Sequence, residues 1–162
     1  MRIGLGWDRH RLAPGRRCVL GGVEFPGEPA GPLGHSDGDA AVHALIDALL
    51  GAAGLGDIGS LFPDTDPVWR DADSLDLLRD VVARVRAAGW RVGNADLVLV
   101  CERPRVAPRR EAIRERLAPL LGVAPAAVSV KATRGEGVGP EGRGECVTAQ
   151  AVVLLLAGGG GT

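Results

Sequence analysis

The chain has 162 residues, 46% of them hydrophobic, and a formal net charge of −1 at pH 7. This length allows one domain with a hydrophobic core, and the near-zero charge excludes the basic surface that is typical of general nucleic-acid binding. Three cysteines without Cys-x-x-Cys spacing favour a reduced compartment, and no apolar run has the length of a membrane span. We therefore expect a soluble, cytoplasmic protein with no nucleic-acid or membrane partner. A single domain is expected over residues 1–157, with a flexible tail at residues 158–162.

The N-terminal part of the chain is predicted to contain two strands. The first covers residues 2–8, where apolar side chains alternate with Gly4 and Gly6. The second is a short strand over residues 18–20. A connection rich in glycine and proline then follows at residues 23–34.

The next predicted element is a helix that begins at Ser36. Ser36 and Asp39 have the spacing of a capping box, and apolar residues follow at helical intervals as far as Gly51 or Gly54. His35 would then lie at the helix N-terminus, where free backbone N–H groups and the helix dipole attract anions. This end of the helix is therefore a candidate phosphate site.

The rest of the chain is predicted to alternate between helices and strands, which favours an α/β (α+β sandwich) fold with a mixed β-sheet and helices packed on one face. The last strand is apolar enough to be buried on both faces. The expected elements are a polar loop at 57–66, a helix at 73–88, a strand at 95–101, a helix from about Pro108 to Gly122, and strands at 128–132 and 146–156.

A candidate metal site combines Asp8, His10 and His43. Asp8 and His10 are two residues apart on a strand, so their side chains point to one face. With His43, which shares a helix side with Asp47, they provide two imidazoles and a carboxylate. A catalytic zinc takes three protein ligands and leaves one position open, and the same set suits iron(II) or another first-row metal. The alternative is that His10 caps a strand end and His43 is a hydrogen-bonded core histidine.

Two loops could bind substrate. Asp57, Asp64 and Asp66 could bind sugar hydroxyls or a hard cation, and the alternative is a solvated turn with Asx caps. Residues 131–144 combine arginines with glycines, so backbone N–H groups and guanidinium groups could approach a phosphate closely.

Four motifs together resemble the 2-C-methyl-D-erythritol 2,4-cyclodiphosphate synthase family. They are Gly-x-Gly-Trp-Asp-x-His at 4–10, Gly-His-Ser-Asp-Gly-Asp-x-x-x-His-Ala-x-x-Asp-Ala-Leu-Leu-Gly-Ala at 34–52, Gly-Asp-Ile-Gly-x-Leu-Phe-Pro-Asp-Thr-Asp at 56–66, and Val-Lys-Ala-Thr at 130–133 followed by Gly-Arg-Gly-Glu at 142–145. The resemblance implies a homotrimer with its sheets around the three-fold axis and active sites between neighbouring subunits. It also implies the family's reaction, which belongs to non-mevalonate isoprenoid biosynthesis.

The implied enzyme is a phosphorus–oxygen lyase. It converts 4-diphosphocytidyl-2-C-methyl-D-erythritol 2-phosphate into 2-C-methyl-D-erythritol 2,4-cyclodiphosphate and CMP, by metal-assisted intramolecular attack of the 2-phosphate on the β-phosphorus. The implied cofactors are Zn²⁺, or another divalent first-row metal, together with Mg²⁺ or Mn²⁺.

The resemblance also assigns residues to roles. Zinc would be held by Asp8, His10 and His43, and magnesium by Glu136. His35, Thr133 and Arg134 would be catalytic. Phosphate would meet His35 and Ser36, the sugar portions would meet the loop at 57–66, cytosine would meet residues 101–107, and Arg143 with its loop would face the trimer axis. The full set of implied substrate contacts is Asp8, Arg9, His10, His35, Ser36, Asp57, Ile58, Gly59, Phe62, Pro63, Asp64, Thr65, Asp66, Cys101, Glu102, Arg103, Pro104, Arg105, Val106, Ala107, Thr133, Arg134, Gly135, Glu136, Pro140 and Arg143.

The chain departs from the family pattern at three places. Where the family has Thr-Thr-Thr-Glu, this chain has Thr-Arg-Gly-Glu, so Arg134 stands at the position of the second threonine. Either Arg134 contacts the diphosphate in its place, or Arg134 turns outward and only Thr133 and backbone amides meet the substrate. A lysine of the cytosine loop is replaced by Arg105, and an aromatic residue near the axis by Pro140. Two other functions use the same metal set: an iron(II) oxygenase, which explains neither loop, and a metal- or phosphate-sensing trimer.

Overall fold

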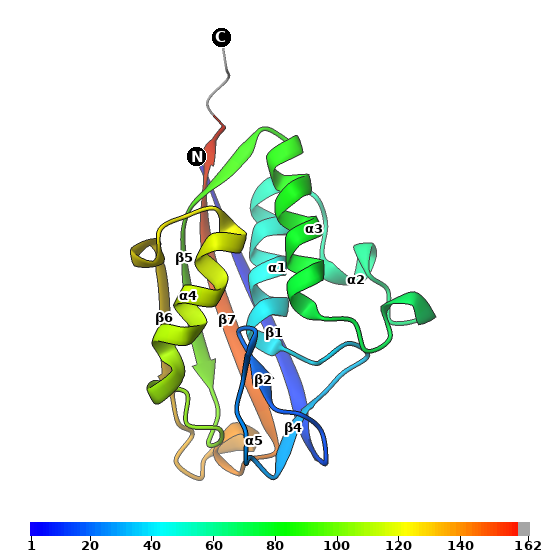
Figure 1. Cartoon of the computed structure of the whole chain (residues 1–162), viewed down its shortest axis with the longest axis vertical. Helices are drawn as coiled ribbons and strands as arrows, with labels where there is room; N and C mark the ends of the chain where they lie inside the picture. The colour runs from blue at the N-terminus through cyan, green and yellow to red at the C-terminus, as the bar shows by residue number, and fades with distance from the viewer. Residues whose placement is uncertain (159–162) are drawn as a thin grey trace.

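A five-stranded mixed β-sheet forms the centre of the computed structural model, which describes residues 1–158 (Figure 1). Residues 159–162, to which most of the predicted tail belongs, lie outside the described residues. Strands β5 and β6 are parallel, and all other neighbouring pairs are antiparallel. In spatial order the strands are β4 (Ala30–Leu33), β1 (Arg2–Pro14), β7 (Cys146–Ala157), β5 (Trp90–Val100) and β6 (Val128–Thr133).

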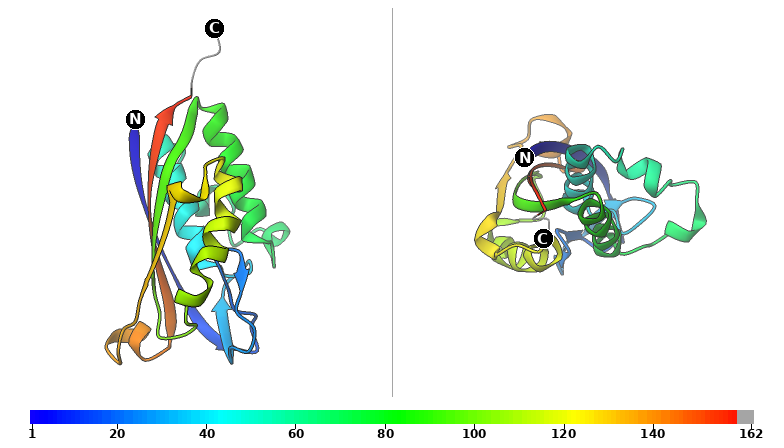
Figure 2. Two further views of the ribbon diagram at one scale, coloured as in Figure 1. Left: turned by 60° about the vertical axis from the view of Figure 1, so that its left-hand side comes forward. Right: turned by 90° about the horizontal axis from the view of Figure 1, so that it is seen from above.

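Three long helices cover one face of this sheet (Figure 2). Helix α1 packs on β1 and β7, α4 packs on β6, and α3 packs on α1. The predicted α+β architecture with helices on one face is therefore confirmed. The helices are α1 (Ala40–Ala53), α3 (Ser74–Ala87) and α4 (Arg110–Leu121), with the short helices α2 (Ile58–Leu61) and α5 (Gly139–Gly142) and 3-10 turns at Pro67–Trp69, Ala107–Arg109 and Pro125–Ala127. In the described part of the chain, no helix is both long and apolar enough to cross a membrane.

Two glycines allow α1 to lie directly on β1. A Cβ atom at Gly4 would lie 1.9 Å from the carbonyl oxygen of Ala48, and one at Gly6 would lie 1.8 Å from that of Ala44. Only a residue without a side chain fits such a close backbone approach. The next inward-facing positions of β1 are Asp8 and His10, so this approach brings them to the N-terminal half of α1.

The start of α1 differs from the prediction. The helix begins four residues later than Ser36, with Asp39 as its N-cap, because the Asp39 carboxylate accepts hydrogen bonds from the N–H groups of Ala41 and Val42. The same fully buried carboxylate accepts from two glycine N–H groups of the preceding hairpin. His35 is consequently not at the helix N-terminus, and the predicted anion site on the helix dipole is wrong. Of the two predicted ends, Gly54 is correct, because it is the C-cap with φ +73°, whereas Gly51 lies inside the helix.

Several other elements also differ from those predicted from the sequence. The predicted connection at 23–34 contains β4 and the strand β3 (Val23–Glu24), which pairs with β2 (Val19–Leu20). Strand β1 continues six residues beyond Asp8, and the polar loop at 57–66 contains α2. The last strand is not buried on both faces, because the sheet face opposite the helices is open in the described chain. Large exposed side chains of that face are Ile3, Leu5, Trp7 and Val152.

Candidate metal centre and substrate clefts

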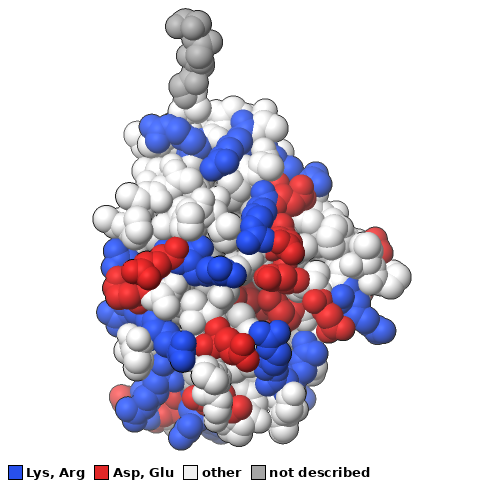
Figure 3. Space-filling model, viewed as in Figure 1, with Lys and Arg blue, Asp and Glu red and all other residues white. Residues whose placement is uncertain are grey.

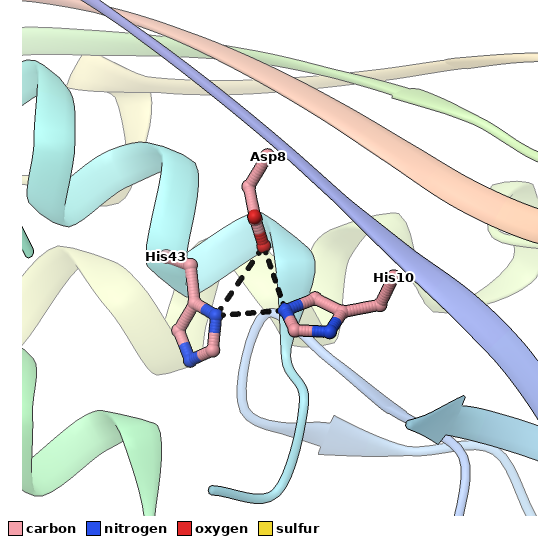
Figure 4. A group of neighbouring side chains, drawn as sticks. All are labelled: Asp8, His10 and His43. Carbon is pink, nitrogen blue, oxygen red and sulfur yellow. Dashed lines mark hydrogen bonds and ion pairs between the residues drawn. The ribbon is translucent and has the colours of Figure 1, made fainter. Parts of the chain in front are cut away.

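Three side chains from β1 and α1 converge on one point (Figure 4). Asp8 Oδ2 lies 2.9 Å from His10 Nε2 and 3.3 Å from His43 Nδ1, and the two ring nitrogens are 3.0 Å apart. Ligand atoms that are ~2.0–2.1 Å from a tetrahedral zinc ion are about 3.3 Å from one another. The predicted set of Asp8, His10 and His43 is therefore brought together at distances close to those of a metal site.

The environment of these three atoms fits a cation better than a hydrogen-bonded cluster. Asp8 Oδ2 is buried and makes no well-directed hydrogen bond, although two ring nitrogens are close to it. The other nitrogen of His10, Nδ1, lies 2.8 Å from the carbonyl oxygen of Leu33. A carbonyl can only accept, so Nδ1 carries the proton and Nε2 directs a lone pair inward. A divalent metal would accept electron pairs from both the Asp8 oxygen and the His10 nitrogen, and so would satisfy the buried carboxylate.

The charge state of the cluster supports cation binding. Burial raises the pKa of Asp8, but the two adjacent imidazoles outweigh burial and lower the pKa overall, so Asp8 is ionised. Burial opposes a charge on His10, but the contact with Asp8 raises the pKa of His10. Because a metal would displace any proton held at the centre, metal binding and proton release are coupled here.

The three side chains Asp8, His10 and His43, called the metal cluster below, lie in a cleft of about 470 Å³. Its walls come from β1, α1 and the segment between α1 and α3, so it unites the predicted metal, phosphate and sugar residues. The lining residues are Asp8, His10, Gly34, His35, Ser36, His43, Ile58, Gly59, Phe62, Pro63, Asp64, Trp69 and Leu77. Trp69 and Leu77 were missed by sequence reasoning, because apolar residues at these positions carry no signal of a cleft.

The three aspartates of the 57–66 loop have different positions. Asp57 caps α2 in a capping box with Ser60, and Asp66 caps the following 3-10 turn. Asp64 lines the cleft. Asp47, on the same side of α1 as His43, accepts a hydrogen bond of 2.8 Å from the backbone N–H of Ile58, and burial raises the pKa of Asp47.

A second cleft of about 330 Å³ contains most of the predicted cytosine and catalytic residues. Arg134 Nε donates to Glu102 Oε1 at 2.9 Å, and the backbone N–H of Glu136 donates to Glu102 Oε2 at 3.1 Å. Glu102 therefore joins the loop after β5 to the loop after β6. The lining residues are Cys101, Glu102, Pro104, Arg105, Val106, Ala107, Pro108, Ala132, Thr133 and Arg134.

Nine of the predicted contact residues line neither cleft: Arg9, Asp57, Thr65, Asp66, Arg103, Gly135, Glu136, Pro140 and Arg143. Arg9 points to the open face of the sheet, where it donates to Thr148 Oγ1 and Glu141. Pro140 and Arg9 line a hollow near the start of β7, and the exposed Arg143 pairs with Glu145 nearby. Over the helix-covered face, acidic and basic side chains are intermingled (Figure 3). A substrate anion would therefore depend on local groups rather than on a broad positive field.

The comparisons with known proteins all point to one family. The model of the YgbB family matches residues 1–156. A protein of Anaeromyxobacter dehalogenans (strain 2CP-C) named "Bifunctional enzyme IspD/IspF" is 58% identical over 157 residues, which are 97% of this chain but 40% of that protein. This chain thus spans less than half the length of that relative.

Two further relatives match over at least 95% of their length. The "2-C-methyl-D-erythritol 2,4-cyclodiphosphate synthase" of Moorella thermoacetica (strain ATCC 39073 / JCM 9320) is 57% identical to this chain. The match covers 96% of this chain and 95% of the Moorella protein. A solved structure described as "2C-Methyl-D-erythritol-2,4-cyclodiphosphate Synthase (bound form CDP)" superposes with a TM-score of 0.87. It is 46% identical and covers 96% of this chain and 100% of its own.

Proposed function

Because this chain belongs to the YgbB family of 2-C-methyl-D-erythritol 2,4-cyclodiphosphate synthases, we propose that it catalyses that cyclisation. The substrate is 4-diphosphocytidyl-2-C-methyl-D-erythritol 2-phosphate, and the products are the 2,4-cyclodiphosphate and CMP. The single observation that carries the proposal is the convergence of Asp8, His10 and His43 inside a cleft lined by His35, Ser36 and Asp64.

The reaction needs positioning more than a strong base. An oxygen of the 2-phosphate forms a bond to the β-phosphorus while the bond from that phosphorus to CMP breaks. Because both phosphates belong to one substrate molecule, their proximity lowers the barrier by roughly 7–11 kcal/mol. Bound zinc and magnesium would supply orientation of the phosphate oxygens and compensation of their charge.

The residues of the first cleft would hold the sugar and its phosphates. Ser36 offers a hydroxyl beside the metal cluster, and His35 lies at the same cleft with its Nε2 3.1 Å from the carbonyl oxygen of Asp66. Asp64 offers a carboxylate that can accept hydrogen bonds from sugar hydroxyls. These groups support the assignment of the methylerythritol end to this cleft.

The second cleft would hold the cytidine end. It combines the apolar side chains of Pro104, Val106 and Ala107, suited to a flat base, with Thr133 and Arg134, suited to phosphate. The solved relative with bound CDP supports a cytidine nucleotide as the ligand. Glu136, at the same loop, would hold magnesium at the diphosphate.

We place the complete active site between two chains. In register, Arg9 of β1 is level with Thr148 of β7, Val100 of β5 and Thr133 of β6. The two clefts therefore lie at the same height along the strands, one at β1 and the other at β6. Three strand spacings separate them by about 14 Å. The hairpin β2–β3, which contacts α1 and α4, fills the helix-covered face between them. A neighbouring chain could supply the missing cleft to each site.

The open face of the sheet supports a homotrimer. Ile3 is 71% exposed and Leu5 is 68% exposed, and both lie beside apolar residues of β7. Apolar side chains gathered on one open face are typical of a surface that packs against another protein. In the proposed homotrimer, these faces pack around the three-fold axis.

The test is release of CMP from the cytidyl substrate by purified protein with defined metals. We expect CMP and the cyclic diphosphate in equal amounts with Zn²⁺ and Mg²⁺, and no product after both metals are removed by a chelator. CMP release without the cyclic product would contradict the cyclisation, since water rather than the 2-phosphate would then be the nucleophile.

A further inference from the structure

The ring nitrogen of His43 that faces away from the metal cluster lies against two buried hydroxyls. His43 Nε2 is 2.9 Å from Ser74 Oγ and 3.1 Å from Ser36 Oγ. Ser74, the first residue of α3, is 0% exposed, and Ser36 is 7% exposed. Both hydroxyls that face this nitrogen are therefore shielded from solvent, and their own hydrogen bonds decide whether Nε2 donates or accepts.

The proton of Ser74 is already used. Ser74 Oγ donates to Asp37 Oδ1, and the backbone N–H of Ser74 donates to Asp37 Oδ2 at 3.1 Å. A carboxylate only accepts, so Ser74 can offer His43 only a lone pair. His43 Nε2 must then carry the proton, and His43 Nδ1 keeps the lone pair that faces Asp8 and His10.

We infer that Asp37 and Ser74 are positioning residues that hold His43 in its Nε2–H tautomer and so direct the Nδ1 lone pair to the metal. This inference rests on the proposed function for its metal, and it assigns a role to two residues that do not touch the metal. A hydrogen-bonded partner on the far nitrogen of a ligating histidine fixes its tautomer and ring orientation.

Ser36, unlike Ser74, does not determine the tautomer of His43. Its hydroxyl oxygen accepts a long hydrogen bond of 3.4 Å from the N–H of Gly38, and no carboxylate holds its proton. The Ser36 hydroxyl can therefore turn to donate or to accept. Asp37, in contrast, is fixed by the N–H groups of Ser74 and Asp39, and its own N–H donates to the carbonyl oxygen of Ala72.

The test uses Asp37→Asn and Ser74→Ala. In Asp37→Asn the new amide can donate to Ser74, whose hydroxyl is then free to donate to His43 Nε2 and favour the opposite tautomer. Zinc affinity is measured at fixed pH by competition with a chromophoric chelator. The histidine tautomers are read by NMR of the ¹⁵N,¹³C-histidine-labelled protein, which has only three histidines.

We expect zinc affinity to fall roughly 10–100-fold in both variants, the range for removal of such outer partners. Asp37→Asn should show the larger fall, and its His43 should lose the pure Nε2–H signature. Asp73→Ala is the matched control, because Asp73 caps α3 one residue earlier without touching His43. It should lower the unfolding midpoint while zinc affinity stays within threefold.

Two results separate the inference from the proposed function. If zinc affinity stays within threefold and His43 remains Nε2–H in Asp37→Asn, the positioning role is wrong even though the metal site stands. If the unchanged protein binds no divalent metal, the proposed function fails at its metal. The tautomer in the metal-free protein then still decides the inference, since Nε2–H in the unchanged chain and its loss in Asp37→Asn would support it.

Discussion

The two histidines of the metal cluster use different ring nitrogens, and their elements explain why. His10 follows Asp8 by two residues on β1, so its ring reaches the cluster with the outer nitrogen, Nε2. His43 comes from α1, which lies directly against the strand, and reaches it with the inner nitrogen, Nδ1. Each ring therefore needs its own partner on the other side, a backbone carbonyl for His10 and buried hydroxyls for His43.

At the scale of single residues, the first prediction concerns His43. His43→Ala removes one ligand of three from a site that keeps an open position, so bound zinc should fall below about a tenth of the normal content, with loss of activity. Metal analysis of the purified variant measures this, and the oligomeric state should not change. His35→Ala is the control, since His35 shares the cleft without belonging to the cluster, and it should retain zinc. Full zinc occupancy in His43→Ala would contradict the ligand assignment.

The second prediction concerns Arg134, which stands where the family has a threonine. Its guanidinium is held by Glu102 at the edge of the second cleft. A guanidinium can bind a phosphate through two N–H groups, whereas a hydroxyl offers one. We predict that Arg134 contacts the diphosphate and that Glu102 orients it for this contact.

Arg134→Ala should then lower kcat/KM at least about tenfold, which corresponds to about 1.4 kcal/mol of transition-state stabilisation. Arg110→Ala, which removes the same charge at the exposed start of α4, is the control and should stay within about twofold. Kinetics at fixed magnesium and ionic strength compare the two. A change within twofold for Arg134→Ala would mean that the side chain makes no contact with the transition state.

At the scale of elements, the contact between β1 and α1 decides where the metal ligands meet. Gly4 and Gly6 let the strand touch the helix backbone, and this contact continues to Asp8 and His10. The neighbouring α1 is almost entirely buried, so it cannot shift without disturbing β7 and α3 as well. The geometry of the site is therefore an outcome of strand–helix packing.

The third prediction compares two glycine-to-alanine changes. Gly6→Ala places a Cβ 1.8 Å from a backbone oxygen of α1, so we expect a loss of about 3 kcal/mol in the free energy of unfolding. Gly51→Ala, inside α1, meets no atom within 4 Å and should stabilise the protein by up to ~1 kcal/mol. Urea denaturation at one protein concentration measures both. Equal effects of the two changes would show that the close approach has no energetic importance.

Periodicity explains which elements could be predicted from the sequence. The spacing of apolar residues predicted α3, α4 and β6, because each buries one regular face. Strand β7 was predicted from its continuous apolar run, which wrongly suggested burial on both faces. Strand β4 was missed, since it is four residues long and contains Pro32. The start of α1 was misplaced because Ser36 and Asp39 both suit an N-cap, and the choice depends on the hairpin that donates to Asp39.

The site was predictable only where its residues share a motif. Asp8 and His10 lie on one strand, and His43 belongs to a long motif, so their convergence followed from the sequence and the resemblance. Ser74 lies 37 residues after Asp37, and neither has a pattern that points to the other. Long-range polar contacts of this kind depend on the packing of α3 against α1, which no local pattern encodes.

At the scale of the whole molecule, the proposed function gives one chain two half-sites. The cleft with His43 and the cleft with Thr133 lie three strands apart across the sheet, with the hairpin β2–β3 between them. A substrate with a sugar phosphate at one end and cytidine at the other would fill both. In the proposed homotrimer, each interface would join the metal half of one chain to the nucleotide half of the next.

The fourth prediction tests this sharing with two inactive variants. His43→Ala disables the metal half, and Ala107→Trp fills the nucleotide cleft at an exposed position, so neither change should prevent folding. In any mixed trimer, one of the three interfaces pairs the two intact halves. Random mixing in equal amounts should therefore restore about a quarter of the original activity. CMP release measures the activity, and native mass spectrometry of differently tagged chains proves that subunits exchanged. Mixed trimers without activity would mean that each chain builds its site alone.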